Sequence, residues 1–258
     1  MALLEVKNLS AGYTDNVIRN VSFCLERGEI VGLLGKNGSG KTTLLRALTG
    51  NIRASGGSVT ADGLDILSMK PGQRAKWMAL MTQQIDILQG IRAGEFICMG
   101  RYAYTGPFSG LTKQDLELCK KAAEQIGVLP LWDQDCTTLS QGQRQLVQLA
   151  AVTAQDAEIL LLDEPSSALD FDNSHRIFSH LQKLTGQRHK SALVVIHDPM
   201  QALNCCDRLL RLEKGTLTGS LEPGRASMEE VQDFFGRLYP GMAVRKDLQS
   251  NAYYCIMN

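Results

Sequence analysis

The chain has 258 residues, of which 44% are hydrophobic, enough to bury the core of one large domain or two small ones. Its 27 Lys and Arg residues balance its 27 Asp and Glu residues, so the composition disfavours a nucleic acid as the main ligand. No apolar run approaches the roughly 20 residues that span a bilayer, and the N-terminus lacks the pattern of an export signal, so we expect a cytoplasmic protein.

The first third of the chain carries strand patterns around one helix. Residues 21–25, VSFCL, alternate as in a half-exposed strand, whereas residues 29–35, EIVGLLG, form an apolar run typical of a strand buried on both faces. Leucines at helical spacing then predict a helix that ends at Gly50. The Asp-Gly pair at 62–63 predicts a hairpin turn, and residues 77–84, WMALMTQQ, predict another core strand.

Strand signals stop at about residue 85, and the next 70 residues read as a helical insert. Residues 143–154, QRQLVQLAAVTA, predict a helix rich in apolar and small side chains. A second predicted helix, residues 114–127, places four apolar side chains on one face: Leu116, Cys119, Ala123 and Ile126.

After the insert, strands and helices alternate again. Residues 158–164, EILLLDE, and 191–197, SALVVIH, predict buried strands, and residues 208–217 predict a hairpin. The first of these strands precedes a helix that carries Ile177, Phe178, Leu181 and Leu184, and the second precedes a short helix from Pro199. A capping box of Ser227 and Glu230 starts a last amphipathic helix, whose apolar residues are Val231, Phe234, Phe235 and Leu238.

These patterns define one domain with an interrupted core. We expect an α/β core in residues 1–84 and 155–220, a helical subdomain in 85–154, and a C-terminal helix and tail in 221–258.

A phosphate-binding loop follows the strand at 29–35. The sequence GKNGSGKTT fits G-x-x-x-x-G-K-[ST] and stands between a buried strand and a helix, the context that this motif requires. Its N–H groups would cradle phosphates, Lys41 would reach the β- and γ-phosphates, and the Thr42 hydroxyl would ligate Mg²⁺. The residues expected to bind ATP here are Gly35, Asn37, Gly38, Ser39, Gly40, Lys41, Thr42 and Thr43.

Acidic and basic side chains end two further strands. Asp163 and Glu164 close the strand 158–164, at the edge of a parallel sheet where ligands collect. Asp163 is positioned to hold Mg²⁺, and Glu164 to accept a proton from the attacking water. His197 ends the strand 191–197 in the same way, and beside Glu164 it would sense the γ-phosphate.

Together with further motifs, these residues resemble the nucleotide-binding subunit of ATP-binding cassette (ABC) transporters, over nearly the whole chain to about residue 238. The resemblance implies a P-loop NTPase with a mostly parallel sheet core, an N-terminal antiparallel β subdomain and an inserted α-helical signature subdomain. The additional features, in chain order, are Tyr13, similar to the aromatic residue that stacks on adenine, Gln83 of the Q-loop, LSQGQ at 139–143, and SALD at 167–170 with Asp170.

The resemblance also implies why one chain has two phosphate-binding motifs. In this family the signature LSGGQ lies at a helix N-terminus and binds the γ-phosphate of the ATP held by the other subunit. Ser140, Gly142 and Gln143 would fill that role, which implies two copies arranged head to tail around two ATP molecules. Gln141 replaces the first glycine of the signature, and we expect its side chain to point away from phosphate.

The helical insert narrows the resemblance further. Residues 94–115, GEFICMGRYAYTGPFSGLTKQD, are similar to the matching stretch of bacterial importer ATPases for iron-siderophore complexes, haem and cobalamin. This implies integral-membrane permease subunits, an extracytoplasmic substrate-binding protein and a peripheral position on the cytoplasmic face of the inner membrane. Gln83, as a Mg²⁺ ligand and catalytic residue, would couple the γ-phosphate to the permease.

Three alternatives remain open from the sequence. The chain could energise the import of another nutrient or metal ion, or an exporter. It could be a soluble ABC ATPase, although no long heptad run separates the P-loop from the signature and only one cassette is present. A scaffold that binds ATP without cleaving it is disfavoured, because Glu164 and His197 are both present.

Overall fold

The computed structural model describes residues 2–83, 89–105, 110–247, 249–250 and 252–257. In these ranges the six-stranded sheet has the order β10-β9-β3-β8-β7-β6, in which all neighbours from β9 to β6 are parallel. Its strands are β3 (Ile30–Leu34), β6 (Met78–Met81), β7 (Ile159–Asp163), β8 (Ser191–Val195), β9 (Arg208–Glu213) and β10 (Thr216–Leu221).

An antiparallel sheet of order β2-β1-β4-β5 packs beside this core, as expected for the N-terminal region. It contains β1 (Ala2–Gly12), β2 (Asn16–Glu26), β4 (Ala54–Ala61) and β5 (Leu64–Asp65). The predicted turn joins β4 to β5, and both of its residues have positive φ, 49° for Asp62 and 78° for Gly63.

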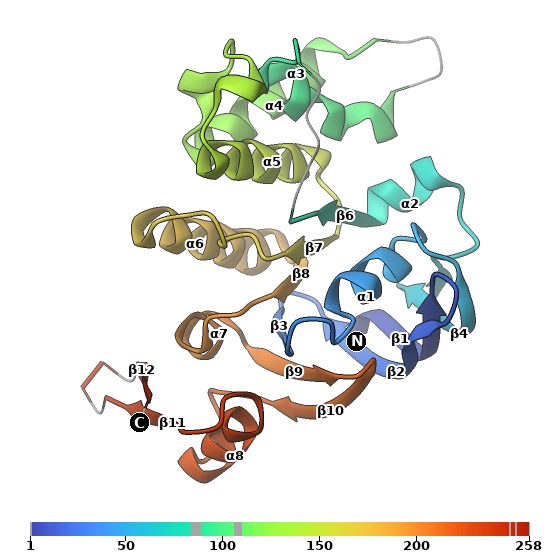
Figure 1. Ribbon diagram of the computed structural model, residues 1–258. Helices are drawn as coiled ribbons and strands as arrows, with labels where there is room; N and C mark the ends of the chain where they lie inside the picture. The colour runs from blue at the N-terminus through green and yellow to red at the C-terminus, as the bar shows by residue number, and fades with distance from the viewer. Residues whose placement is uncertain (1, 84–88, 106–109, 248, 251, 258) are drawn as a thin grey trace.

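Helices cover both faces of the six-stranded sheet (Figure 1). Alternate residues of the buried strands divide between two cores. Val31, Leu161 and Leu193 face α1 and the N-terminal sheet. Leu160 and Val194 face the helices on the other side. The helices are α1 (Lys41–Leu48), α2 (Pro71–Trp77), α3 (Ala93–Met99), α4 (Lys113–Ile126), α5 (Gln141–Gln155), α6 (Phe171–Arg188), α7 (Pro199–Cys205) and α8 (Met228–Leu238). The predicted fold class is therefore confirmed.

The helical insert stands at one end of the molecule, and α8 at the other (Figure 1). One prediction in the insert is wrong: Leu116 is 40% exposed. The buried face of α4 continues from Cys119 back to Asp115, whose carboxylate accepts a hydrogen bond from Arg101 Nε at 3.0 Å. Because this buried ion pair takes the inward position, Leu116 is turned to solvent.

The GRY sequence at 100–102 forms a 3₁₀ turn, η1 (Gly100–Tyr104), against α2 and α5. Arg101 is buried, donates to the Ala154 carbonyl at 3.1 Å and lies 3.9 Å from the centre of the Tyr104 ring. Tyr102, in contrast, is 60% exposed. Part of the segment that carried the importer resemblance, residues 106–109, lies outside the described residues.

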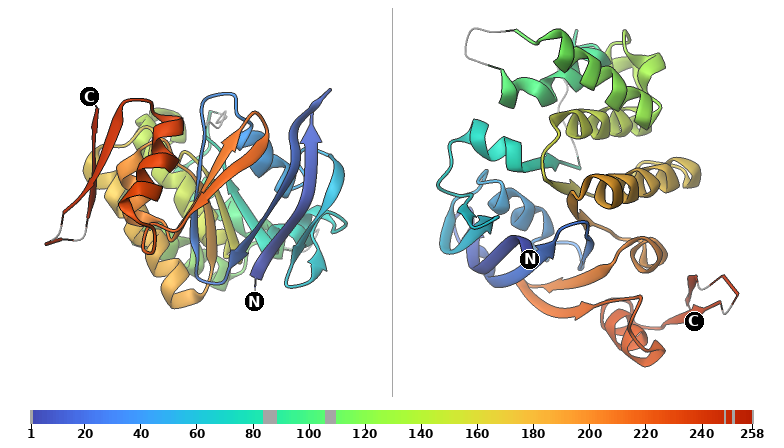
Figure 2. Two further views of the ribbon diagram at one scale, coloured as in Figure 1. Left: turned by 90° about the horizontal axis from the view of Figure 1, so that it is seen from below. Right: turned by 180° about the vertical axis from the view of Figure 1, so that it is seen from behind.

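Two features had no counterpart among the predicted elements. The helix α2 precedes β6, and the C-terminal tail forms a hairpin of β11 (Met242–Lys246) and β12 (Tyr253–Met257) beside α8 (Figure 2). None of the helices within the described ranges has the length and apolar character that a membrane-crossing segment needs.

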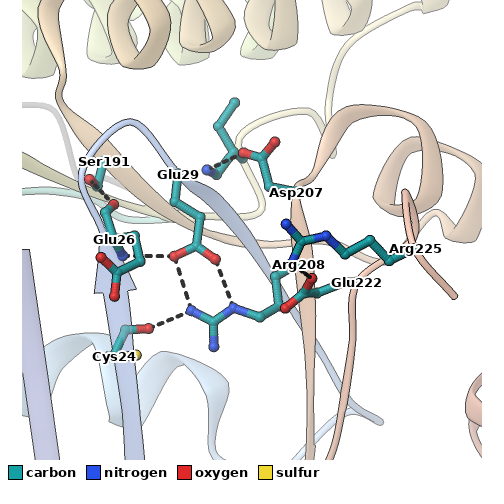
Figure 3. A network of polar contacts seen from close by, with 9 residues as sticks. Cys24, Glu26, Glu29, Ser191, Asp207, Arg208, Glu222 and Arg225 are labelled. Atoms are coloured by element: carbon teal, nitrogen blue, oxygen red, sulfur yellow. Dashed lines mark hydrogen bonds and ion pairs between the residues drawn. The ribbon is translucent and has the colours of Figure 1, made fainter. Parts of the chain in front are cut away.

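A polar network fixes the start of β3 (Figure 3). Arg208 of β9 binds both oxygens of Glu29, at 2.7 and 3.0 Å, and also the Cys24 carbonyl. The hydrogen bond to Glu29, opposed by burial, raises the pKa of Arg208. Asp207 accepts from the Ile30 N–H at 2.8 Å, and the Ser191 hydroxyl donates to the Glu26 carbonyl. The strand that leads into the glycine-rich loop is thereby anchored to its neighbours.

Candidate functional site

A cavity of about 580 Å³ opens at the carboxyl ends of the parallel strands, around the N-terminus of α1. Residues from the glycine-rich loop, from three strand ends and from β2 form its wall. They are Val17, Asn37, Gly38, Ser39, Gly40, Lys41, Thr42, Thr43, Gln83, Glu164 and His197. Val17 was not among the predicted residues, because nothing in the alternating pattern of β2 distinguishes it.

Two glycines give the loop its shape. Gly40, the N-cap of α1, has φ 105°, and a Cβ atom there would lie 2.8 Å from Ile18 Cδ1. Gly35 has no room for a side chain either, since a Cβ atom would come within 2.3 Å of the Leu212 carbonyl oxygen. The chain can therefore wrap tightly and direct its N–H groups, with those of the α1 N-terminus, into the cavity.

Lys41 places a cation at the centre of this loop. The residue is only 6% exposed, and its ammonium group donates to the carbonyls of Gly35 at 2.8 Å and Lys36 at 3.3 Å. Burial lowers the pKa of Lys41, while the nearby Glu164 and Asp163 act to raise it. The arrangement is suited to a polyanion, because phosphate oxygens can replace the two carbonyls as acceptors.

Asp163 and Thr42 meet beside Lys41. Burial raises the pKa of Asp163, partly offset by a hydrogen bond to the Thr42 side chain. Within the described ranges, Asp163 Oδ1 and Ser39 Oγ are buried polar atoms without a hydrogen-bond partner. Burying a polar atom without a partner costs free energy unless a ligand supplies the missing hydrogen bond or coordination. A carboxylate oxygen next to a hydroxyl fits Mg²⁺, and the Ser39 hydroxyl fits a phosphate oxygen.

Glu164 is held between two of the predicted side chains. Gln83 Nε2 donates to Glu164 Oε2 at 2.7 Å, and His197 Nε2 lies 2.6 Å from Glu164 Oε1. Glu164 also has φ 54°, a left-handed conformation that is uncommon for a residue with a side chain. Its carboxylate is thus directed into the cavity by the backbone and by both neighbours.

Two glutamines of α5, which the sequence analysis did not single out, fasten the strand ends. Gln145 donates to the Glu164 carbonyl at 2.8 Å and accepts from the Ala168 N–H at 3.2 Å. Gln148 donates to the carbonyl of Thr82, the residue before Gln83, at 2.9 Å. Both are buried polar residues among the apolar side chains of α5, a signal that could have identified them.

The signature residues 139–143 are not among the described residues that line this cavity. Ser140 caps α5, accepting from the Gln143 N–H at 3.2 Å, and Gln143 Oε1 accepts from the Ser140 N–H in return. Gly142 lies against the segment after Glu164, where a Cβ atom would be 3.1 Å from the Ala168 carbonyl oxygen. Gln141 is exposed.

Tyr13 and Asp170 also lie outside the cavity wall. Tyr13 is 66% exposed, and its hydroxyl accepts from Arg46 of α1 at 2.9 Å. Asp170 caps α6 and accepts from the Asn173 N–H at 2.9 Å. The glycine-rich loop, Gln83, Glu164 and His197 therefore come together, whereas Tyr13, Asp170 and the signature residues stand apart from them.

Comparisons with known proteins agree with this site. A family model described as ABC transporter matches residues 18–167. The iron(3+)-hydroxamate import ATP-binding protein FhuC of Bacillus subtilis is 33% identical, over 84% of this chain and 81% of that protein. The uncharacterized ABC transporter ATP-binding protein YvrA of the same organism is 36% identical over 88% of this chain, which spans only 52% of YvrA.

The fold has a close structural counterpart. A solved structure described as a metal-chelate type ABC transporter in an inward-facing conformation superposes with a TM-score of 0.80 and 25% identity. The match covers 99% of this chain and 96% of the other.

Proposed function

The chain belongs to the ABC transporter family and is an ATP-binding ATPase, and from this premise we propose that it is the ATP-hydrolysing subunit of a bacterial importer for a metal chelate of the iron-siderophore, haem or cobalamin type. Two copies would close head to tail on two ATP molecules and drive a membrane permease. One observation carries this paired arrangement: the signature residues 139–143 are absent from the described wall of the cavity in their own chain.

The reaction proposed at the site is attack of water on the γ-phosphorus, which breaks the bond from this phosphorus to the β–γ bridging oxygen and releases ADP and inorganic phosphate. The glycine-rich loop and Lys41 bind the β- and γ-phosphates and leave the terminal phosphorus exposed to the cavity. Glu164 accepts the proton of the attacking water through the carboxylate that Gln83 and His197 orient at 2.7 and 2.6 Å. His197 also donates to a γ-phosphate oxygen.

Thr42 and Asp163 would hold Mg²⁺, with Gln83 as a further ligand, and the ion would neutralise charge on the β- and γ-phosphates. The buried, unpartnered Asp163 Oδ1 supports this assignment within the described part of the chain. Asp163 must be ionised for that role, so Mg²⁺ binding opposes the rise in pKa that burial causes.

The partner subunit's Ser140, Gly142 and Gln143 would complete each site. The capped α5 helix presents its N-terminus at the surface, where its first N–H groups can meet an anion of another chain. Tyr13 would stack on adenine from the exposed side of α1, and Asp170 would lie at the interface. Gln141 is exposed in this turn and leaves the backbone of Gly142 accessible.

The permease is proposed to dock on the helical insert. Met99 and Tyr102 are exposed apolar side chains there, 39% and 60% accessible, on the part of the chain that follows Gln83. The relative FhuC, an import protein for an iron(3+) chelate, and the metal-chelate type transporter structure support import of this cargo class. The chain would then act on the cytoplasmic face of the membrane, and an extracytoplasmic binding protein would deliver the chelate.

Co-purification tests this proposal. Tagged protein would be recovered from detergent-solubilised bacterial membranes, with Lys41→Ala as a matched bait that lacks the phosphate-binding ammonium group. Recovery of a polytopic permease, and stimulation of the ATPase of that complex by a chelate-loaded binding protein, is the expected result. Recovery of ribosomal or other soluble assemblies instead would favour a cytosolic ABC ATPase. Recovery of a permease complex whose ATPase is stimulated by a different solute would keep the importer assignment and change only the proposed cargo.

A further inference from the structure

His197 lies in the short connection between β8 and α7, beyond the last residue of β8. β8 ends at Val195, and α7 begins at Pro199, so the imidazole is carried by residues 196–198. Ile196 N donates to the Leu33 carbonyl at 3.2 Å, which fixes the start of this connection. A small change in its path would move the ring relative to Glu164, which it contacts at 2.6 Å.

The C-terminal helix reaches this connection through one side chain. Tyr239, directly after α8, donates its hydroxyl to the His197 carbonyl at 3.0 Å. Its ring is nearly parallel to that of Phe235, at 16° with 6.4 Å between centres, and its N–H donates to the Phe235 carbonyl. Phe235 is completely buried, so the hydroxyl projects from a rigid base.

The same C-terminal segment also holds the far end of α7. Asn204 exchanges two hydrogen bonds with the backbone of Tyr253 in β12, both at 2.9 Å. Gln232 of α8 in turn fastens β11, donating to the Met242 carbonyl at 2.6 Å and accepting from the Val244 N–H at 2.9 Å. α7 therefore cannot shift along its axis without disturbing the hairpin, and Tyr239 controls the end next to His197.

We propose that Tyr239 is a positioning residue for hydrolysis: its hydrogen bond to the His197 carbonyl sets the imidazole against Glu164 and the γ-phosphate. The inference rests on the proposed role of His197. It gives the C-terminal helix α8 a task in the catalytic cycle, because any partner that moved α8 would change the turnover of bound ATP. Tyr239 touches neither nucleotide nor water in this role.

The test removes one oxygen atom. Tyr239→Phe keeps the stacked ring and loses the hydrogen bond, so kcat of the full-length ATPase should fall about three- to tenfold while KM for ATP is unchanged. In the His197→Ala background the same substitution should have no additional effect on kcat, since its effect passes through the imidazole. If Tyr239 had only a structural role, Tyr239→Phe would reduce kcat by the same factor in the wild-type and His197→Ala backgrounds.

A matched control separates positioning from stability. The Tyr253 hydroxyl donates to the Pro223 carbonyl at 2.7 Å, a buried bond of the same kind, but it reaches no residue of the cavity wall. Tyr253→Phe should therefore lower the melting temperature about as much as Tyr239→Phe and leave kcat at the wild-type value.

A second readout does not depend on activity. The chain has four histidines, and selective ¹⁵N-histidine labelling with His197→Ala identifies the His197 signals. Tyr239→Phe should shift them, and Tyr253→Phe should not. Unshifted His197 signals together with wild-type kcat in Tyr239→Phe overturn the inference. A wild-type rate in His197→Ala would instead contradict the proposed role of His197, so the two failures are distinguishable.

Discussion

The side-chain amide of Gln145 donates to the main-chain carbonyl of Glu164 at 2.8 Å, and this bond joins α5 to the backbone of the residue proposed as the catalytic base. Gln145 also accepts from the Ala168 N–H, so it spans the segment that follows β7. We therefore expect a rotation of the helical insert to reach the backbone of Glu164, whose φ of 54° is an uncommon conformation for a residue with a side chain.

Gln145→Leu should uncouple the two elements. The substitution keeps the volume but leaves the Glu164 carbonyl and the Ala168 N–H without their partner, so we expect kcat for ATP hydrolysis to fall about tenfold with little change in ATP affinity. Steady-state phosphate release and ATP titration measure the two quantities. Gln182→Leu, an exposed position on α6, is the control, and equal rates in both variants would refute the coupling.

Lys41→Ala should remove nucleotide binding rather than the chemical step alone. The ammonium group donates to the Gly35 and Lys36 carbonyls at the centre of the loop. Losing the contacts proposed for it with the β- and γ-phosphates should weaken ATP binding by a hundredfold or more. Isothermal titration calorimetry checks this, with Lys120→Ala on the exposed side of α4 as the control. Unchanged ATP affinity in Lys41→Ala would mean that phosphates bind elsewhere.

The P-loop core was predictable because local chemistry determines it. Fully buried and mostly apolar runs form β3, β7 and β8, and glycines are required where a Cβ atom would collide, as at Gly40. The strand ends then bring Gln83, Glu164 and His197 to one cavity, since parallel strands present their carboxyl ends at the same edge.

Other features depend on partners far away in the sequence, and periodicity does not reveal these. Leu116 was assigned to the buried face of α4, but Arg101 neutralises Asp115 there. Tyr239 and His197 are 42 positions apart and meet only when the end of α8 comes to lie against the connection between β8 and α7. The C-terminal hairpin has a tail sequence without a clear strand pattern, and it forms because α7 and α8 supply hydrogen-bond partners.

Gln141, which stands where the family signature LSGGQ has its first glycine, should be compatible with ATP hydrolysis. The side chain is exposed in the first turn of α5, and Ser140 and Gln143 still form the capping box without it. Gln141→Gly should therefore change the rate of ATP hydrolysis less than about threefold, with a small loss of stability because glycine is a poor helix former. A hundredfold loss of activity would show that the glutamine binds ATP or the partner subunit.

Asp115→Asn should destabilise the helical insert in a pH-dependent manner. Hydrogen bonds from the Thr112 side chain and backbone, and then the bond from Arg101, lower the pKa of Asp115 in the folded state. Its stabilisation is therefore complete above the unfolded pKa of about 4 and is lost as the pH falls through the lower folded value.

Urea unfolding at two pH values measures that effect. At pH 7 we expect Asp115→Asn to lower the free energy of unfolding by about 2 kcal/mol, because Arg101 loses its buried counter-ion. Below about pH 4 the difference from wild type should shrink. Asp133→Asn, at an exposed carboxylate, is the control. A difference that stayed constant or grew with acid would contradict the assigned ion pair.

The proposed arrangement, two chains that complete each other's ATP sites, is tested most directly with Glu164→Gln. This variant keeps the phosphate contacts and loses the proton acceptor, so ATP should persist between the subunits. Light scattering after size exclusion, with ATP and Mg²⁺, should give twice the chain mass of 28.3 kDa, and Lys41→Ala added to the same variant should return it to the monomer. A monomer at an ATP concentration shown to saturate Glu164→Gln would contradict the head-to-tail dimer.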